Sequence, residues 1–314
     1  MLPIFPVFKP IEIKDQEDVE KITKNYPAYS NFNFVSLFCW DISGKRRIST
    51  LDGNLVIRST SDITGKEFLT FMGDKNVVET IARLLKYSKK EGLNPALHLV
   101  PEEAVKHCSE HSSPINAKED RDNFDYIYLV DDIASLRGDK YANLRKSVNK
   151  FAKMHENRFR VDFFDLNQVK CKKEMLNVWH QWNGMNERYS AREEIAFSRL
   201  LDNSNAFELT NSMVFVDDIP VAFSINHIAN EETSISHFAK ANYNFKGVLP
   251  FMDNQMALHL QKIGCKYMNF EEDMGMESLR FAKSKYRPTR FLKKYTIQGK
   301  QSIIKRCLSL RLFS

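Results

Sequence analysis

Three strand patterns in close succession constrain this chain more than any other feature of its sequence. They cover residues 213–216, 219–229 and 233–240, and only two short polar turns separate them, Asp217-Asp218 and Asn230-Glu231-Glu232. Connections this short predict neighbouring strands that run antiparallel, as a meander.

The elements around the meander complete a specific order. A strand over 160–164 and helices over 170–182 and 192–201 precede it, and an apolar helix over 251–263 and a strand over 266–270 follow it. This order of strand, two helices, three antiparallel strands, helix and strand resembles the N-acetyltransferase-like (GNAT) fold. We therefore predict an α/β (α+β) chain whose second half is a GNAT-like domain.

The first half mixes helix and strand patterns and looks like a degraded copy of the same unit. The patterns predict helices over 15–26 and 77–91, a hairpin around Asp52-Gly53, strands over 96–100 and 124–130, and a loop over 107–122. We expect two tandem GNAT-like (acyl-CoA N-acyltransferase) domains at 1–130 and 159–314. A basic helix within 131–158 connects them, with Tyr141, Leu144, Val148 and Phe151 as its buried stripe.

Charge is distributed unevenly along the chain. The net charge is +6, but residues 278–314 contain eleven Lys or Arg and no Asp or Glu. Such an asymmetry indicates an anionic partner near the C-terminal end. The last part of this stretch, 300–314, alternates apolar and basic residues, which favours either an amphipathic helix on a membrane surface or packing on the domain.

Cysteine usage and hydropathy bear on the compartment. The five cysteines are scattered and form no CxxC pair, which favours a reduced, cytoplasmic setting. His107, Cys108 and His111 lack a second ligand pair, so we expect no metal site.

No apolar run reaches the roughly 18 residues of a transmembrane helix, and the first residues lack the features of a secretory signal. Any membrane contact is expected to be peripheral.

Several ordered motifs carry a resemblance to a known family. They are Phe38-Cys39-Trp40, the run 53–58, Arg137-Gly138-x-Lys140-Tyr141, Arg145-Lys146-x-x-Asn149-x-Phe151 and Asn269-x-Glu271-x-Asp273-x-Gly275-x-x-x-Leu279-Arg280-x-Ala282-Lys283-x-x-Tyr286-x-Pro288. Together they resemble the soluble proteins related to the C-terminal domain of phosphatidylglycerol lysyltransferases, over nearly the whole chain. The resemblance implies a tandem GNAT architecture shared with Fem-type peptidoglycan aminoacyltransferases.

The resemblance also implies a chemistry. Relatives of known activity move an aminoacyl group from aminoacyl-tRNA to a lipid hydroxyl or a peptidoglycan amine, so we expect tRNA as a partner, an acceptor that the sequence does not identify, and no cofactor. Coenzyme A is a weaker expectation, because the run 245–250 has a single Gly where a phosphate cradle needs several free N–H groups, and Pro250 removes one. The alternatives are a CoA-dependent N-acyltransferase and a non-catalytic binding protein.

Three residues are candidates for catalysis. Glu271 and Asp273 come at the end of the last predicted strand, where alternation sends both to one side and Glu272 to the other. Either carboxylate could bind the α-ammonium of the donor or act as a general base, and the alternative is a structural ion pair with Arg280 or Lys283. Tyr286 could donate a hydrogen bond to an oxyanion or serve as a packing residue.

The candidate substrate-binding residues are mostly basic. Arg137 and Lys140 flank Gly138 at a helix start, a favourable position for an anion. Arg280 and Lys283 lie three residues apart on one helix face. Lys146 belongs to a helical basic stripe that would track phosphates or be an ordinary solvated face. The motifs add Asn149 and Asn269.

Overall fold

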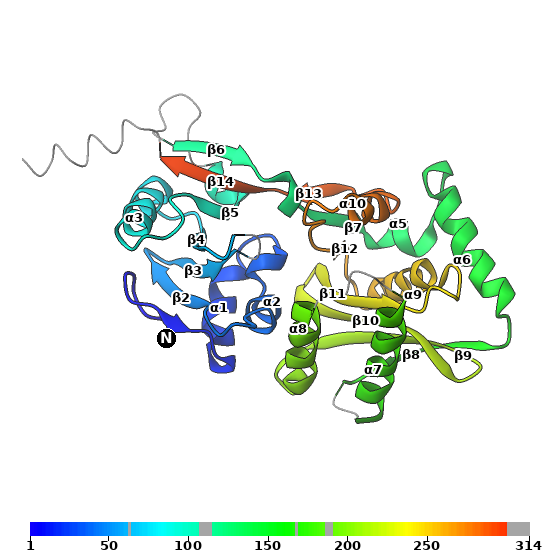
Figure 1. The fold of residues 1–314 in the computed structure, drawn as a ribbon. Helices are drawn as coiled ribbons and strands as arrows, with labels where there is room; N and C mark the ends of the chain where they lie inside the picture. Colours follow the sequence, from blue (N-terminus) through cyan, green and yellow to red (C-terminus); the bar gives the residue numbers. More distant parts are fainter. Residues whose placement is uncertain (62–63, 107–114, 167–168, 186–190, 300–314) are drawn as a thin grey trace, which may run out of the picture. The chain divides into compact units, whose positions relative to one another are not determined.

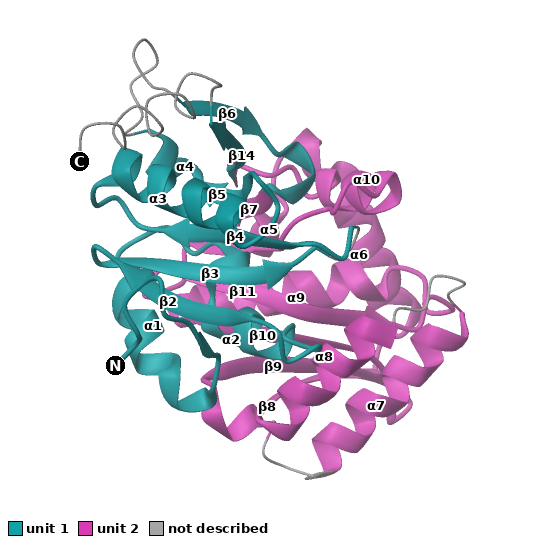
Figure 2. Cartoon of the chain, turned by 60° about the vertical axis from the view of Figure 1, so that its left-hand side comes forward, with its two compact units in different colours: residues 1–124, 292–314 teal, residues 125–291 magenta. Residues whose placement is uncertain are grey.

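The computed structural model describes residues 1–61, 64–106, 115–166, 169–185 and 191–299 (Figure 1). The chain divides into two compact units, one made of residues 1–124 and 292–314 and the other of residues 125–291 (Figure 2). Two stretches considered above lie outside the described residues: His107, Cys108 and His111, where no metal site is expected, and the alternating apolar and basic segment 300–314.

The first unit is built on a seven-stranded sheet in the order β1-β2-β3-β4-β5-β14-β6. Its strands are β1 (Lys9–Pro10), β2 (Arg47–Leu51), β3 (Asn54–Thr60), β4 (Glu67–Met72), β5 (Leu97–Pro101), β6 (Ile115–Glu119) and β14 (Lys294–Gly299). Its helices are α1 (Gln16–Thr23), α2 (Phe34–Cys39), α3 (Val77–Lys90) and α4 (Glu102–Val105). The predicted hairpin is confirmed, with Asp52 and Gly53 both at positive φ in the turn between β2 and β3.

Two features of this sheet differ from the sequence-based prediction. Residues 115–119 were predicted as loop but form the edge strand β6, in which only Ile115 is buried, so the apolar alternation of a strand is missing. Strand β14 was assigned to the second domain but pairs antiparallel with β5 and β6 of the first. Ile297 on β14 is fully buried in that core, which accounts for the return of the chain to the first unit.

The second unit carries a seven-stranded sheet in the order β13-β7-β12-β11-β10-β9-β8. Its strands are β7 (Asp125–Leu129), β8 (Phe159–Phe164), β9 (Leu209–Val216), β10 (Ile219–Asn230), β11 (Thr233–Ala241), β12 (Tyr267–Asn269) and β13 (Arg290–Leu292). Its helices are α5 (Val130–Ser135), α6 (Ala142–Met154), α7 (Val169–Gly184), α8 (Ala191–Asp202), α9 (Val248–Lys262) and α10 (Glu277–Ser284). The predicted meander is confirmed as β9, β10 and β11.

Helices cover both faces of the second sheet. On one face, Trp179 of α7 stacks on Phe197 of α8, with ring centroids 4.5 Å apart, and Phe197 packs on Phe238 of β11. On the other, Phe151 of α6 packs on Phe251 of α9 at 4.7 Å. The buried stripe predicted for α6 is confirmed, but α6 shares this core with α9 and belongs to the second unit instead of connecting two domains.

Candidate functional site

The second sheet opens at one point between two strands. Strand β12 runs parallel to β11 and pairs only with its first three residues, ending with Ile235 opposite Asn269, whereas β11 continues to Ala241. The ladder between β10 and β11 shifts register at the same place, because Ile225 pairs with Phe238 and Asn226 with Ser236. His237 is therefore the extra residue of a β-bulge, a feature that re-aims side chains and leaves a backbone group outside the ladder.

A carboxylate meets the bulge residue. Glu271 Oε1 lies 3.1 Å from His237 Nδ1, and the exposed fraction of the side chain is 20% for Glu271 and 1% for His237. Burial lowers the pKa of His237 to about 3, so its ring is neutral at physiological pH. Because a carboxylate only accepts hydrogen bonds, this pair assigns the imidazole proton to Nδ1. The centroid of the His227 ring is 6.1 Å from that of His237.

The backbone around Glu271 explains its direction. Strand β12 ends at Asn269, and Glu271 has the left-handed φ of 57°. Its N–H donates to Asn269 Oδ1 at 2.7 Å, while Asn269 Nδ2 donates to buried Asp125 at 3.1 Å. The predicted alternation of Glu271 and Asp273 to one side is therefore wrong, since the strand ends before it reaches them. Asn269 holds Glu271 in place from inside the fold.

Asp273 is an internal structural carboxylate. It accepts hydrogen bonds from Arg280 Nε and Nη2 (2.9 Å each), from Tyr126 Oη (2.6 Å) and from the Gly275 N–H (2.9 Å), and its side chain is fully buried. Burial alone would raise the pKa of Asp273, but the hydrogen bonds from Arg280, Tyr126 and Gly275 outweigh it and lower the pKa to about 2. A carboxylate this acidic is a poor general base at neutral pH, so the structural alternative accounts for Asp273 and Arg280.

Lys283 and Tyr286 also point inward. The Lys283 ammonium donates to the backbone carbonyls of Phe270 and Glu272, which ties α10 to the segment that carries Glu271. Tyr286 is buried, and its hydroxyl donates to Asp253 Oδ2 at 2.5 Å. Burial raises the pKa of Asp253 to about 7, and the hydrogen bond from Tyr286 opposes that rise. These contacts favour packing and positioning roles over the predicted roles as substrate ligand and oxyanion donor.

The remaining predicted residues lie on one basic surface. We define this surface as Arg137, Lys140, Lys146, Asn149, Lys150 and Lys153, all of which are exposed. Lys140 forms an ion pair with Asp132 at 3.1 Å, and its backbone carbonyl accepts a hydrogen bond from Arg287 Nε at 3.3 Å, which adds another cation at the same place. The structure thus separates the predicted site residues into an internal group near Glu271 and an external group on α6 and the turn before it.

The segment before α9 is closely packed. Gly247 has a φ of 90°, and a Cβ at this position would lie 2.6 Å from the Ser147 carbonyl oxygen of α6. The single glycine of the predicted phosphate-loop region therefore serves the approach of α6 to α9. Pro250 follows in the first turn of α9.

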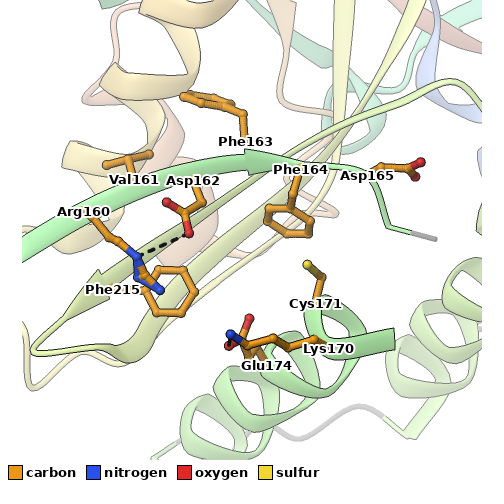
Figure 3. A pocket seen from close by; sticks show the side chains of 10 residues that line it. All are labelled: Arg160, Val161, Asp162, Phe163, Phe164, Asp165, Lys170, Cys171, Glu174 and Phe215. Carbon is orange, nitrogen blue, oxygen red and sulfur yellow. Dashed lines mark ion pairs between the residues drawn. The ribbon is translucent and has the colours of Figure 1, made fainter. Parts of the chain in front are cut away.

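A recess of about 670 Å³ lies elsewhere on the second unit, between β8 and the start of α7 (Figure 3). Three strands, β9, β10 and β11, separate β8 from β12 in the sheet, so the recess is distinct from the Glu271 site.

Sequence reasoning set aside or missed four residues of the Glu271 region: His237, Tyr126, Asp125 and Asp253. His237 lies within the strand predicted over 233–240, and nothing in its sequence neighbours reveals a bulge. Tyr126 and Asp125 come from β7, about 145 residues before their partners. The alternating Asp-Tyr-Ile-Tyr pattern of β7, with polar groups inside a buried strand, is the one signal that the sequence offers.

Comparisons with solved structures agree with this architecture. A conserved protein of unknown function from Bacteroides thetaiotaomicron superposes with a TM-score of 0.80 at 24% identity, covering 95% of this chain and 99% of that one. The C-terminal domain of a putative lysylphosphatidylglycerol synthetase from Agrobacterium fabrum gives 0.64 at 14% identity, with 93% and 94% covered. FemX gives 0.56 at 11% identity, with 96% and 99% covered. No curated protein matches the chain.

These likenesses agree with the predicted fold class, a mixed α/β chain with two sheets, and show that the fold is shared with a lysylphosphatidylglycerol synthetase C-terminal domain and with FemX. No helix among the described residues is long and apolar enough to cross a membrane. Residues 23–298 match the family described as phosphatidylglycerol lysyltransferase, C-terminal. The chain therefore belongs to the phosphatidylglycerol lysyltransferase C-terminal family.

Proposed function

We propose that this protein is an acyltransferase that moves an aminoacyl group from aminoacyl-tRNA to an amine or hydroxyl acceptor. The observation that carries the proposal is the pairing of Glu271 with neutral His237 where β11 and β12 part. It places a partly exposed carboxylate beside a bulged strand, and both parts are useful for acyl transfer. The acceptor is identified only by its nucleophilic N–H or O–H group.

The reaction needs a base and an oxyanion ligand. Glu271 takes the proton of the acceptor as the nucleophile attacks the ester carbonyl, directly or through one water. The developing oxyanion needs a hydrogen-bond donor aimed at it, and we place that donor beside Glu271, where the bulged strand passes. The ester C–O bond then breaks, the new amide or ester bond remains with the acceptor, and the proton passes to the departing ribose oxygen. His237 keeps the carboxylate oriented through its Nδ1–H.

The basic surface supports tRNA as the carrier of the acyl group. Lys146, Lys150 and Lys153 recur at helical spacing on the exposed side of α6, and Arg137 and Lys140 extend the surface toward the turn before it. Exposed cations of this kind bind phosphates without reading sequence. Each phosphate contact contributes to a binding constant that falls with salt.

Coenzyme A as the donor is disfavoured by the packing of Gly247. A pyrophosphate cradle needs open backbone N–H groups before a helix. At this position the α6 backbone lies against Gly247, and Pro250 supplies no N–H. CoA is therefore the weaker of the two candidate donors.

A salt-series titration of charged against uncharged tRNA, with CoA as competitor, tests the donor. We expect preference for the charged form that persists at physiological salt and is insensitive to CoA. Glu271→Gln should retain this binding and lose transfer, whereas Lys146→Ala should weaken both tRNA forms equally and reduce the salt slope by about 1.

Equal binding of the two tRNA forms, abolished by salt, would remove the support for an aminoacyl-tRNA donor. Displacement of the bound RNA by CoA would favour CoA as the donor instead of aminoacyl-tRNA. Charged-tRNA binding with transfer unaffected by Glu271→Gln would keep the donor and refute the base.

A further inference from the structure

Strand β8 forms an open edge of the second sheet. All six of its residues pair with β9, and in the part of the chain that the structure describes no strand pairs with its other side. The strand contains neither Pro nor Lys, and Arg160 and Phe163 are exposed. An edge of this kind presents unpaired backbone N–H and C=O groups to any strand that fits beside it.

The two faces of β8 carry different side chains. Phe159 packs on Phe251 of α9, and Phe163 stacks on His259 of α9 with ring centroids 4.1 Å apart. Arg160 and Phe164 face the other way, into the recess beside α7 (Figure 3). The strand thus has an aromatic face on the α9 side and a charged face on the α7 side.

The charged face is complementary to itself. Arg160 and Asp162 lie two residues apart with Val161 between them, and Arg160 Nε is 3.4 Å from Asp162 Oδ2 (Figure 3). If a second β8 runs antiparallel with Val161 opposite Val161, Arg160 of each strand faces Asp162 of the other. Opposite charges directly across an antiparallel pair attract, and like charges there repel.

The side chains on the two faces of β8 also favour this register between the two strands. With Val161 at the centre, Phe159 lies opposite Phe163 of the second strand, and both sheets keep their α9 sides together. A shift of one residue exchanges the faces, and Arg160 would then oppose Phe163. The guanidinium of Arg160 lies over the ring of Phe215, its partner on β9, at 3.6 Å from the centroid, which fixes the Arg160 side chain on the α7 side of the sheet.

We propose that β8 is a self-recognition edge, through which two copies of this chain pair as an antiparallel, two-fold dimer with one continuous sheet. Such an interface is isologous, and each copy contributes the same residues to it. The recess beside α7 lies next to this edge, so the strand added by the second copy extends the wall of each recess.

A charge-reversal cycle tests the dimer, with sedimentation velocity of the full chain over a wide range of concentration. We expect the wild type to dimerise. Arg160→Asp and Asp162→Arg each create two like-charge pairs and should weaken the dimer about tenfold or more. An equimolar mixture of the two variants should recover a heterodimer, because each charge then meets its opposite, and the double variant should recover the homodimer.

Two controls separate pairing from folding. Glu231→Lys reverses an exposed charge in the turn between β10 and β11, away from β8, and should dimerise like the wild type. Circular dichroism checks that each variant is folded. A wild type that stays monomeric at every concentration would overturn the proposal, and so would a dimer that both single reversals leave intact or a mixture of folded variants that does not pair.

Discussion

The contrast between Asp273 and Glu271 gives the sharpest test of the site. Asp273→Asn removes a fully buried charge that Arg280, Tyr126 and Gly275 all hold, so we expect it to lower stability. Glu271→Gln changes a carboxylate that is partly exposed, so we expect it to lower transfer and leave stability almost unchanged. The two carboxylates lie two residues apart in the sequence and should nevertheless fail in different assays.

The magnitude for Asp273 follows from its pKa. A fall from the ordinary value of 3.8 to about 2 corresponds to about 2.5 kcal/mol of preferential interaction with the charged form. Arg280 is 37% exposed, so solvent screens part of this interaction. We therefore expect Asp273→Asn to lower the free energy of unfolding by about 2 kcal/mol at neutral pH.

The contribution of Asp273 to stability depends on pH in a defined direction. Because the folded state lowers the pKa of Asp273, its contribution to stability is present above the ordinary value of 3.8 and is lost as the pH falls toward about 2. The gap between the wild type and Asp273→Asn should therefore close across that acid window. Urea unfolding followed by tryptophan fluorescence measures it, since Trp179 and Trp182 are buried in the second unit.

Two results would refute this reasoning. Wild-type stability of Asp273→Asn together with lost transfer would give Asp273 the catalytic role and leave its ion pair without structural weight. A stability gap that stays constant down to the acid limit would show that the charge of Asp273 is not what the network stabilises.

Three further predictions concern other parts of the second unit. Burial raises the pKa of Asp253 to about 7. The free energy of unfolding of the wild type should therefore fall as the pH rises from 3.8 to about 7, by up to about 1.4 kcal/mol per pH unit. Asp253→Asn should remove this slope in urea titrations, and an unchanged slope would contradict the assignment. Gly247→Ala places a Cβ against the α6 backbone at positive φ and should cost about 3 kcal/mol, whereas Gly264→Ala, at a φ of 87° in open space, should cost about 1 kcal/mol; equal shifts in thermal unfolding would refute the packing argument. Lys146→Ala should leave thermal unfolding unchanged, because Lys146 is exposed on α6, and a clear loss of stability would assign it a structural role instead.

Local patterns were good guides wherever neighbours in sequence are neighbours in space. The meander β9–β11 follows from short turns, and Asp217 and Asp218 both adopt positive φ, as a two-residue hairpin turn requires. The buried stripe of α6 follows from helical spacing alone. In each case the residues that decide the structure lie within a few positions of one another.

Pairings between distant segments escaped the sequence. Strand β14 joins the first sheet beside β5, nearly 200 residues earlier, and no local pattern marks that choice. Tyr126 reaches Asp273 across 147 positions, and Tyr286 reaches Asp253 across 33. A hydrogen bond between distant residues depends on how strands are ordered in the sheet, which periodicity does not report.

The candidate site shows the same division. The acidic and basic residues of 271–287 predicted a functional region, and the motifs predicted its family. Their partners separate the two carboxylates, since Asp273 is surrounded by donors and is acidic and fixed, whereas Glu271 meets a neutral imidazole and is partly exposed. By itself the sequence determined the order of elements from β8 to β12, which resembles the GNAT-like fold, and the chemical types present. Only the tertiary structure decided that Glu271 faces His237 while Asp273 is locked inside, because burial and hydrogen bonding depend on neighbours that the chain brings together after folding.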